Sequence, residues 1–228
     1  AALPKSPHVP MILGSDGERL SRRHGAVSVM QYRDDGYLPA ALVNYLARLG
    51  WSQGDDELFS REQLVQWFDL EHVSQSPARF DPEKLKWLNS QYLKSEDDEF
   101  LAGLARPFME KAGVDTRNGP ALAQVIALVK ERVSTLVELA AAVGYFYRAA
   151  APSDELKRQH YSAETRPALE DLKGKLAAVE WKREPIGEAI KSVVAAHKLK
   201  MPKVAMPLRV MITGTAQTPS VGAVLELK

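Results

Sequence analysis

Apolar residues recur every three or four positions along most of the chain after residue 29, which is the spacing of one helix face. In the segment YLPAALVNYLARLGW, Pro39 stands just inside the start and Gly50 follows the last periodic residue. Proline in the first turn and glycine after the last turn are typical of helix ends. The same spacing continues over residues 61–68, 82–93, 121–147, 164–179 and 185–199. The pattern therefore predicts an all-α protein built from helical bundles.

Polar residues at the ends of these stripes predict where helices begin. Ser60 and Gln63 form a capping-box pattern, and Asp81 followed by Pro82 reads as an N-cap and first-turn pair. Ser95, with Asp97 and Asp98 after it, predicts a cap and acidic first turn for the next helix.

Three further segments are read from their residue types. Residues 133–135 are weak helix formers, so a break is expected inside the 121–147 pattern. The short apolar run MPLRVMITG, residues 206–214, fits a strand or a helix by periodicity alone. Residues 218–228 predict a final helix.

Composition narrows the class of protein. The 228 residues include no cysteine, which excludes disulfides and thiolate metal sites and fits a cytoplasmic protein. No apolar run approaches the length of about 18 residues needed to span a membrane. The five histidines are scattered singly and suggest no metal site: His8, His24, His72, His160 and His197.

Charge is distributed unevenly although the net charge is only +1. Residues 1–33 carry five basic and two acidic side chains, and residues 198–228 carry five basic and one acidic. Residues 51–104 carry five basic and twelve acidic side chains. A polyanion would therefore be bound by the two basic ends, although such runs also occur as plain solvated faces.

The segment GSDGERLSRRHGAVSV, residues 14–29, places three arginines between Gly17 and Gly25. Backbone N–H groups and cationic side chains that converge in this way suit a phosphate ligand. A basic surface turn is the simpler alternative.

The residues around this loop, from HVPMILG through NYLARLGW, closely resemble the bacterial glutamyl-tRNA synthetases, which are class I aminoacyl-tRNA synthetases. In that family a mobile loop of the pattern Lys-Met/Leu-Ser-Lys-Ser/Arg closes on ATP at the C-terminal edge of a Rossmann catalytic domain. The resemblance implies that ATP is bound here by Arg19, Leu20, Ser21, Arg22 and Arg23. Arg19 and Arg22 stand where the family usually has lysine, which keeps the charge but changes its geometry.

The resemblance covers essentially the whole chain and implies three domains. Residues 1–33 would be a short remnant of the Rossmann catalytic domain, residues 34–104 the stem-contact helical region, and residues 105–228 the helical anticodon-binding domain. The parent enzyme would ligate glutamate to tRNA(Glu) through a glutamyl-adenylate, using ATP with Mg²⁺, as a cytoplasmic monomer. The family's other signature, a His-Ile-Gly-His-like motif, has no counterpart here, so this chain alone is expected to be inactive.

Candidate contacts to tRNA are polar residues beside the core stripes, namely Lys84, Lys86, Asn89, Gln91 and Arg209. Arg209 is a lone cation within an apolar run, so it requires either a buried carboxylate or RNA as a partner. The asparagine and glutamine would reach base edges or sugar hydroxyls. Packing or simple solvation is the competing explanation for each of the five.

Two other classes of protein remain open. A glutaminyl-tRNA synthetase shares the loop and the stem-contact region, but that family reads its anticodon with β-barrels, whereas residues 105–197 are helical by pattern. A non-catalytic helical RNA-binding or scaffold protein would keep the same architecture without the enzyme.

Overall fold

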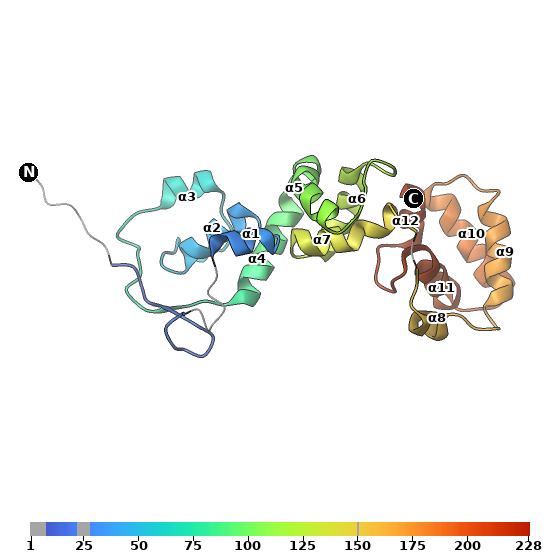
Figure 1. The fold of residues 1–228 in the computed structure, drawn as a ribbon, viewed down its shortest axis with the longest axis horizontal. Coiled ribbons are helices and arrows are strands. Elements are labelled where there is room, and N and C mark those ends of the chain that lie inside the picture. The colour runs from blue at the N-terminus through green and yellow to red at the C-terminus, as the bar shows by residue number, and fades with distance from the viewer. Residues whose placement is uncertain (1–7, 22–27, 150) are drawn as a thin grey trace, which may run out of the picture. The chain divides into compact units, whose positions relative to one another are not determined.

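The computed structural model describes residues 8–21, 28–149 and 151–228, and the chain divides into two compact units (Figure 1). The first unit contains the residues up to Glu96 together with Val133–Glu138, and the second contains Asp97–Arg132 and Leu139–Lys228. Helices dominate both units, as the sequence predicts. No helix in the described ranges is long and apolar enough to cross a membrane.

Among its described residues up to Glu96, the first unit combines four helices with two very short strands. The helices are α1 (Val29–Asp34), α2 (Pro39–Arg48), α3 (Arg61–Trp67) and α4 (Pro82–Ser95). The strands β1 (Ile12–Leu13) and β2 (Ala78–Arg79) pair in parallel, with Ile12 opposite Ala78 and Leu13 opposite Arg79. This pairing attaches the N-terminal loop region directly to the residues that lead into α4.

The core of the first unit lies between α2 and α4. Leu42 and Tyr45 from α2 pack against Leu85 and Leu88 from α4, with Phe80 and several tyrosines around them. The Tyr45 hydroxyl is 2.9 Å from the Asp81 carbonyl, to which it donates, and accepts from the Asp81 N–H. The start of α4 is therefore fixed against α2.

The second unit is entirely helical among its described residues. In chain order its elements are α5 (Asp98–Lys111), α6 (Leu122–Val129), η2 (Lys130–Arg132), the later part of α7 (Leu136–Val143), η3 (Gly144–Phe146), α8 (Asp154–His160), α9 (Arg166–Leu176), α10 (Arg183–Ala196), α11 (Met201–Thr213) and α12 (Val221–Leu227). The first turn of α7 belongs to the first unit, so this helix begins in one unit and ends in the other.

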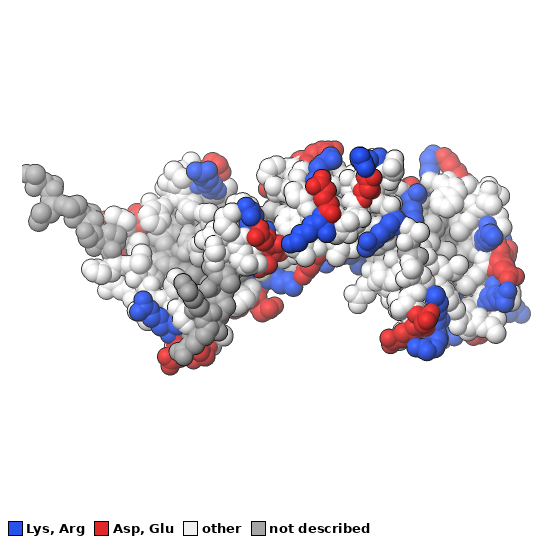
Figure 2. Space-filling model, in the orientation of Figure 1, with Lys and Arg blue, Asp and Glu red and all other residues white. Residues whose placement is uncertain are grey.

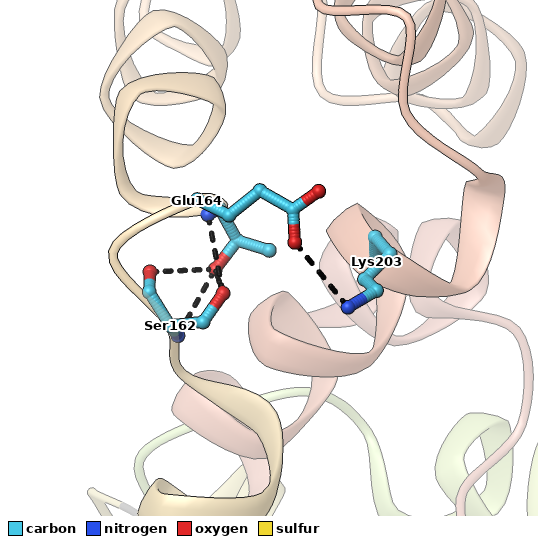
Figure 3. Close-up of polar contacts among 4 residues, drawn as sticks. Ser162, Glu164 and Lys203 are labelled. Atoms are coloured by element: carbon cyan, nitrogen blue, oxygen red, sulfur yellow. Dashed lines mark hydrogen bonds and ion pairs between the residues drawn. The ribbon is translucent and has the colours of Figure 1, made fainter.

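The C-terminal helices of the second unit share one core. Buried residues of α9, α10, α11 and α12 form it, among them Leu172, Ile186, Val193, Val204 and Val221. The turn before α9 is closed by hydrogen bonds between Ser162 and Thr165, and Glu164 in the same turn is 3.5 Å from Lys203 of α11 (Figure 3). These contacts hold the start of α9 beside the start of α11.

Most boundary predictions are confirmed. The capping box at Ser60 and the cap at Asp81 are both present, and the expected break separates α6 and η2 from α7. Residues 206–213 prove to be helical, with Gly214 as the C-cap, and Ser220 caps the final helix.

Three features differ from the sequence pattern or extend it. Ser95 is the last residue of α4 rather than a cap, because Asp97 accepts the hydrogen bond from the Phe100 N–H at the start of α5. The short helices α1 and α8 were not predicted. The pairing of β1 with β2 was also missed, because two-residue strands leave no periodic signal.

Candidate nucleotide and RNA interface

The first half of the basic loop is anchored in a small hairpin. The Leu20 N–H donates to the Ile12 carbonyl at 2.9 Å, and the Gly14 N–H donates to the Glu18 carbonyl at 2.8 Å. At its tip Gly17 has a φ of 83°, a conformation that favours glycine. Because β1 in this hairpin also pairs with β2, the backbone that leads into the loop is held against the rest of the first unit.

The predicted ATP-contacting residues are placed only in part. Arg19 is exposed, whereas Leu20 and Ser21 are half-buried. Arg22 and Arg23 lie outside the described residues, so the structure does not test their predicted role.

A small pocket of about 240 Å³ lies beside β2 and the start of α4. Its charged lining residues are Arg48, Glu57, Arg79, Asp81 and Lys84. Lys84 forms an ion pair with Glu57, and this hydrogen bond lowers the pKa of the Glu57 carboxyl. The Nη1 atom of Arg48 is buried without a hydrogen-bond partner among the described residues. The Asp81 carboxylate caps α4, so the pocket keeps an excess of positive charge and an unused donor.

Two of the predicted tRNA contacts are instead engaged within the protein. Asn89 is fully buried: its Oδ1 accepts from the Leu38 N–H at 2.8 Å, and its Nδ2 donates to the Ser134 carbonyl at 2.6 Å. Lys86 lies 2.8 Å from a carboxylate oxygen of Glu138. Both side chains therefore connect parts of the first unit.

Gln91 makes one hydrogen bond to a neighbouring side chain, and Lys84, which pairs with Glu57, also lies beside an exposed aromatic ring. The Gln91 side chain is half-buried and donates to the neighbouring Ser90 hydroxyl at 3.2 Å. Lys84 lies near the Trp87 ring, with its ammonium 6.0 Å from the ring centroid. Trp87 itself is 43% exposed, so the pair presents a cation and an aromatic surface together.

In the second unit, Arg209 lies in α11 without a carboxylate partner among the described residues. Its Nη1 is 3.3 Å from the Ala216 carbonyl and 3.3 Å from the Met206 sulfur, and its buried Nε has no partner. The buried carboxylate that the sequence left open as an explanation is thus not found in the described ranges.

A second arginine, which the sequence pattern does not single out, acts electrostatically on the same phenol as Arg209. Burial raises the pKa of Tyr145 to about 12, and the positive charges of Arg132 and Arg209 act on this phenol in the opposite direction. We name Arg132, Tyr145 and Arg209 the arginine–tyrosine cluster. Arg132 is exposed at the end of η2. Its position directly before the predicted break at 133–135 was the one available signal.

Lys228, which directly follows α12, contacts the elements that carry Tyr145 and Arg209. The Lys228 ammonium donates to the carbonyls of Tyr145 and Ile212, each at 2.8 Å. These two bonds tie η3, which carries Tyr145, to α11, which carries Arg209.

On the face shown in Figure 2, Lys and Arg side chains lie among Asp and Glu side chains, so no field of one sign covers that face.

Comparisons with known proteins find matches for both parts of the chain. Residues 1–87 match the catalytic domain of class I tRNA synthetases (E and Q), and residues 100–227 match an anticodon binding domain. Glutamate–tRNA ligase of Nitrosospira multiformis is 62% identical over 229 residues, covering 100% of this chain and 49% of the relative. The chain belongs to the anticodon-binding-domain family, and its relatives are glutamate–tRNA ligases.

Other members of the family match over the same extent. Glutamate–tRNA ligase of Thiobacillus denitrificans is 58% identical over 227 residues, covering 100% of this chain and 48% of the relative. A crystal structure of a glutamate tRNA ligase from Elizabethkingia meningosepticum, in complex with its amino acid, has a TM-score of 0.85. It is 29% identical and covers 96% of this chain and 48% of its own. The chain thus spans about half the length of its family relatives.

The family assignment decides between the classes that the sequence left open. The relatives are named as glutamate–tRNA ligases, and the helical second unit lies within the anticodon-binding match, so neither a glutaminyl-tRNA synthetase nor a non-catalytic scaffold is favoured. Within the described part of the chain, no group of His, Asp and Glu side chains could hold a metal ion.

Proposed function

We propose that this chain is the tRNA-binding half of an enzyme that ligates glutamate to tRNA(Glu) through an ATP-derived glutamyl-adenylate. The observation that carries this proposal is the presence, on one chain, of a class I catalytic-domain match followed by an anticodon-domain match. We assign residues 1–33 to the edge of the catalytic domain, 34–104 to the stem-contact region and 105–228 to the anticodon-binding domain. The enzyme would act as a cytoplasmic monomer, with Mg²⁺ accompanying ATP.

The loop from Arg19 to Arg23 is the part that would meet ATP. The hairpin of residues 12–20 supplies a fixed base, and the cations after it would neutralise the charge that develops on the pyrophosphate leaving group. In the full-length enzyme, Arg22→Ala should slow single-turnover adenylate formation, with a loss of about 2–4 kcal/mol of transition-state stabilisation. Arg22→Lys should slow it much less, because lysine also binds phosphate. A rate for Arg22→Ala within about twofold of the parent would leave the loop as a surface turn.

Two sets of residues would meet tRNA. Arg48, Arg79, Lys84 and Gln91 of the first unit would contact the backbone of the stem, since the pocket offers an unused guanidinium donor and net positive charge. The arginine–tyrosine cluster of the second unit would contact the anticodon arm, where unpaired bases offer stacking faces and acceptors. Its half-satisfied Arg209 guanidinium supports this assignment.

A titration of this chain with purified tRNA(Glu) tests the proposal. Binding that neutralises roughly three to five phosphates should weaken steeply as salt increases. Arg132→Ala should reduce the slope of log affinity against log salt by about 1. The matched control is Arg166→Ala, because Arg166 is an exposed arginine of the same unit that pairs with Glu170. No binding by the parent, or equal losses in the two variants, would contradict the proposal.

A further inference from the structure

The segment Val133–Glu138 belongs to the first unit although the chain on both sides of it belongs to the second. We call this segment, with the residues that hold it, the latch. It includes the first turn of α7, and the rest of that helix continues into the second unit. The chain thus leaves the second unit after Arg132 and returns to it at Leu139.

Four polar contacts hold the latch. Nδ2 of buried Asn89 donates to the Ser134 carbonyl at 2.6 Å, and the Leu136 N–H donates to the Gly36 carbonyl at 2.9 Å. The Glu138 carboxylate accepts from the Ser134 N–H at 2.8 Å and pairs with Lys86 at 2.8 Å. Three of these contacts come from other elements, two from side chains of α4 and one from the Gly36 carbonyl, so the segment has a defined register against α4 and the turn before α2.

The latch is joined directly to the arginine–tyrosine cluster. Arg132 immediately precedes Val133, and η3, which carries Tyr145, directly follows the end of α7. A shift of Arg132 on binding RNA would be applied to one end of the latch through a single peptide bond, and a shift of Tyr145 would be applied to the other end through the rest of α7. The other side of the latch rests on α4, whose N-terminal residues line the pocket beside the loop region.

We propose that the latch positions the first unit for catalysis in response to RNA bound at the arginine–tyrosine cluster, so that Lys86, Asn89 and Glu138 are positioning residues for anticodon-dependent charging. This inference rests on the proposed function. The latch residues need not contact tRNA, because they act through the backbone of residues 133–138.

The test uses the full-length synthetase that carries this half, with two RNA substrates. One is tRNA(Glu), and the other is the same tRNA with its anticodon bases replaced. The parent should charge the first with a kcat at least about tenfold above the second. Lys86→Met should reduce that ratio by about fivefold, with the kcat for the altered tRNA and the Kd for tRNA(Glu) both within about twofold of the parent. Lys86→Arg, which keeps the ion pair, should restore the ratio.

Asn89→Ala provides a second variant at a different contact and should reduce the ratio in the same way if the enzyme stays folded. A merely structural role predicts that charging of both tRNAs falls equally, or that neither falls, and either outcome would overturn the latch. A parent that charges tRNA(Glu) but does not distinguish the two substrates would overturn it as well. A parent that charges neither RNA would instead refute the proposed function.

Discussion

At position 36 the backbone requires a residue without a side chain. Gly36 has a φ of 84°, and a Cβ built there would lie 2.7 Å from the Val137 nitrogen and 2.8 Å from the Leu136 nitrogen. Gly36→Ala should therefore cost about 2–4 kcal/mol in the free energy of unfolding, from left-handed strain and from displacement of the latch. Urea unfolding followed by circular dichroism would measure this cost.

Gly54→Ala is the matched control for this substitution. Gly54 also has a positive φ, of 52°, but a Cβ there would meet nothing within 4 Å. Gly54→Ala should cost only the strain of the left-handed backbone, about 1–2 kcal/mol in the free energy of unfolding. Equal costs at the two positions would mean that the close approach of residues 136 and 137 contributes nothing.

The Glu138 carboxylate should make the latch sensitive to acid. Burial alone would raise the pKa of Glu138, but the hydrogen bonds from Lys86 and the Ser134 N–H outweigh it and hold the pKa below its ordinary value of 4.5. Because the folded pKa is depressed, the stabilisation is present above pH 4.5 and is lost as pH falls through the folded pKa. Glu138→Gln keeps an acceptor for Ser134 and loses only the charge.

The comparison of urea midpoints for the parent and Glu138→Gln should therefore depend on pH. The parent should be more stable at pH 7 by less than about 1 kcal/mol, since the pair is partly exposed and screened. This difference should shrink below pH 4.5. A difference that stays constant from pH 7 to pH 3.5 would show that the charge of Glu138 does not support the latch.

At the scale of elements, α4 depends on its first turn. The Asp81 carboxylate accepts from the Glu83 N–H at 2.9 Å and the Lys84 N–H at 3.2 Å. Asp81→Ala leaves these donors without a cap and should cost about 1–2 kcal/mol, whereas Asp81→Asn keeps an acceptor and should cost much less. Thermal unfolding of the three proteins would measure this, and equal stability of Asp81→Ala and the parent would contradict it.

The elements that sequence patterns predicted are those with strong local signals. Pro39, Asp81 and the capping box at Ser60 act on their own first turns, so their helices begin where expected. The pairing of β1 with β2 joins residues about 66 positions apart and depends on tertiary contacts that no local pattern encodes.

The contacts that polar side chains make within the protein are less predictable from the sequence than the helices, for the same reason. Asn89 was read as a possible RNA contact because it is polar and lies beside a core stripe, yet its partners are Leu38 and Ser134. Arg132 carries no local signal, because nothing near it in the sequence indicates that its charge and that of Arg209 act on the same phenol. Which polar side chains remain available for a ligand is decided by packing between distant segments.

At the scale of the whole molecule, the chain should bind RNA without performing the chemistry of its family. Adenylate formation requires glutamate and ATP to be held in line, and such positioning with preorganised charge supplies most of the catalysis in reactions of this type. These 228 residues contain a loop that resembles one class I signature and no counterpart of the other. The isolated chain should therefore show no glutamate-dependent pyrophosphate exchange above background, with or without tRNA(Glu).

The full-length synthetase is the positive control for this assay, and salt-sensitive tRNA binding by the same preparation shows that the isolated chain is folded. Binding without exchange would separate the two activities physically: recognition would belong to the helical units, and activation would need residues outside this chain. Exchange above background by the isolated chain would contradict this division, because the loop from Arg19 to Arg23 and its neighbours would then suffice to position both substrates.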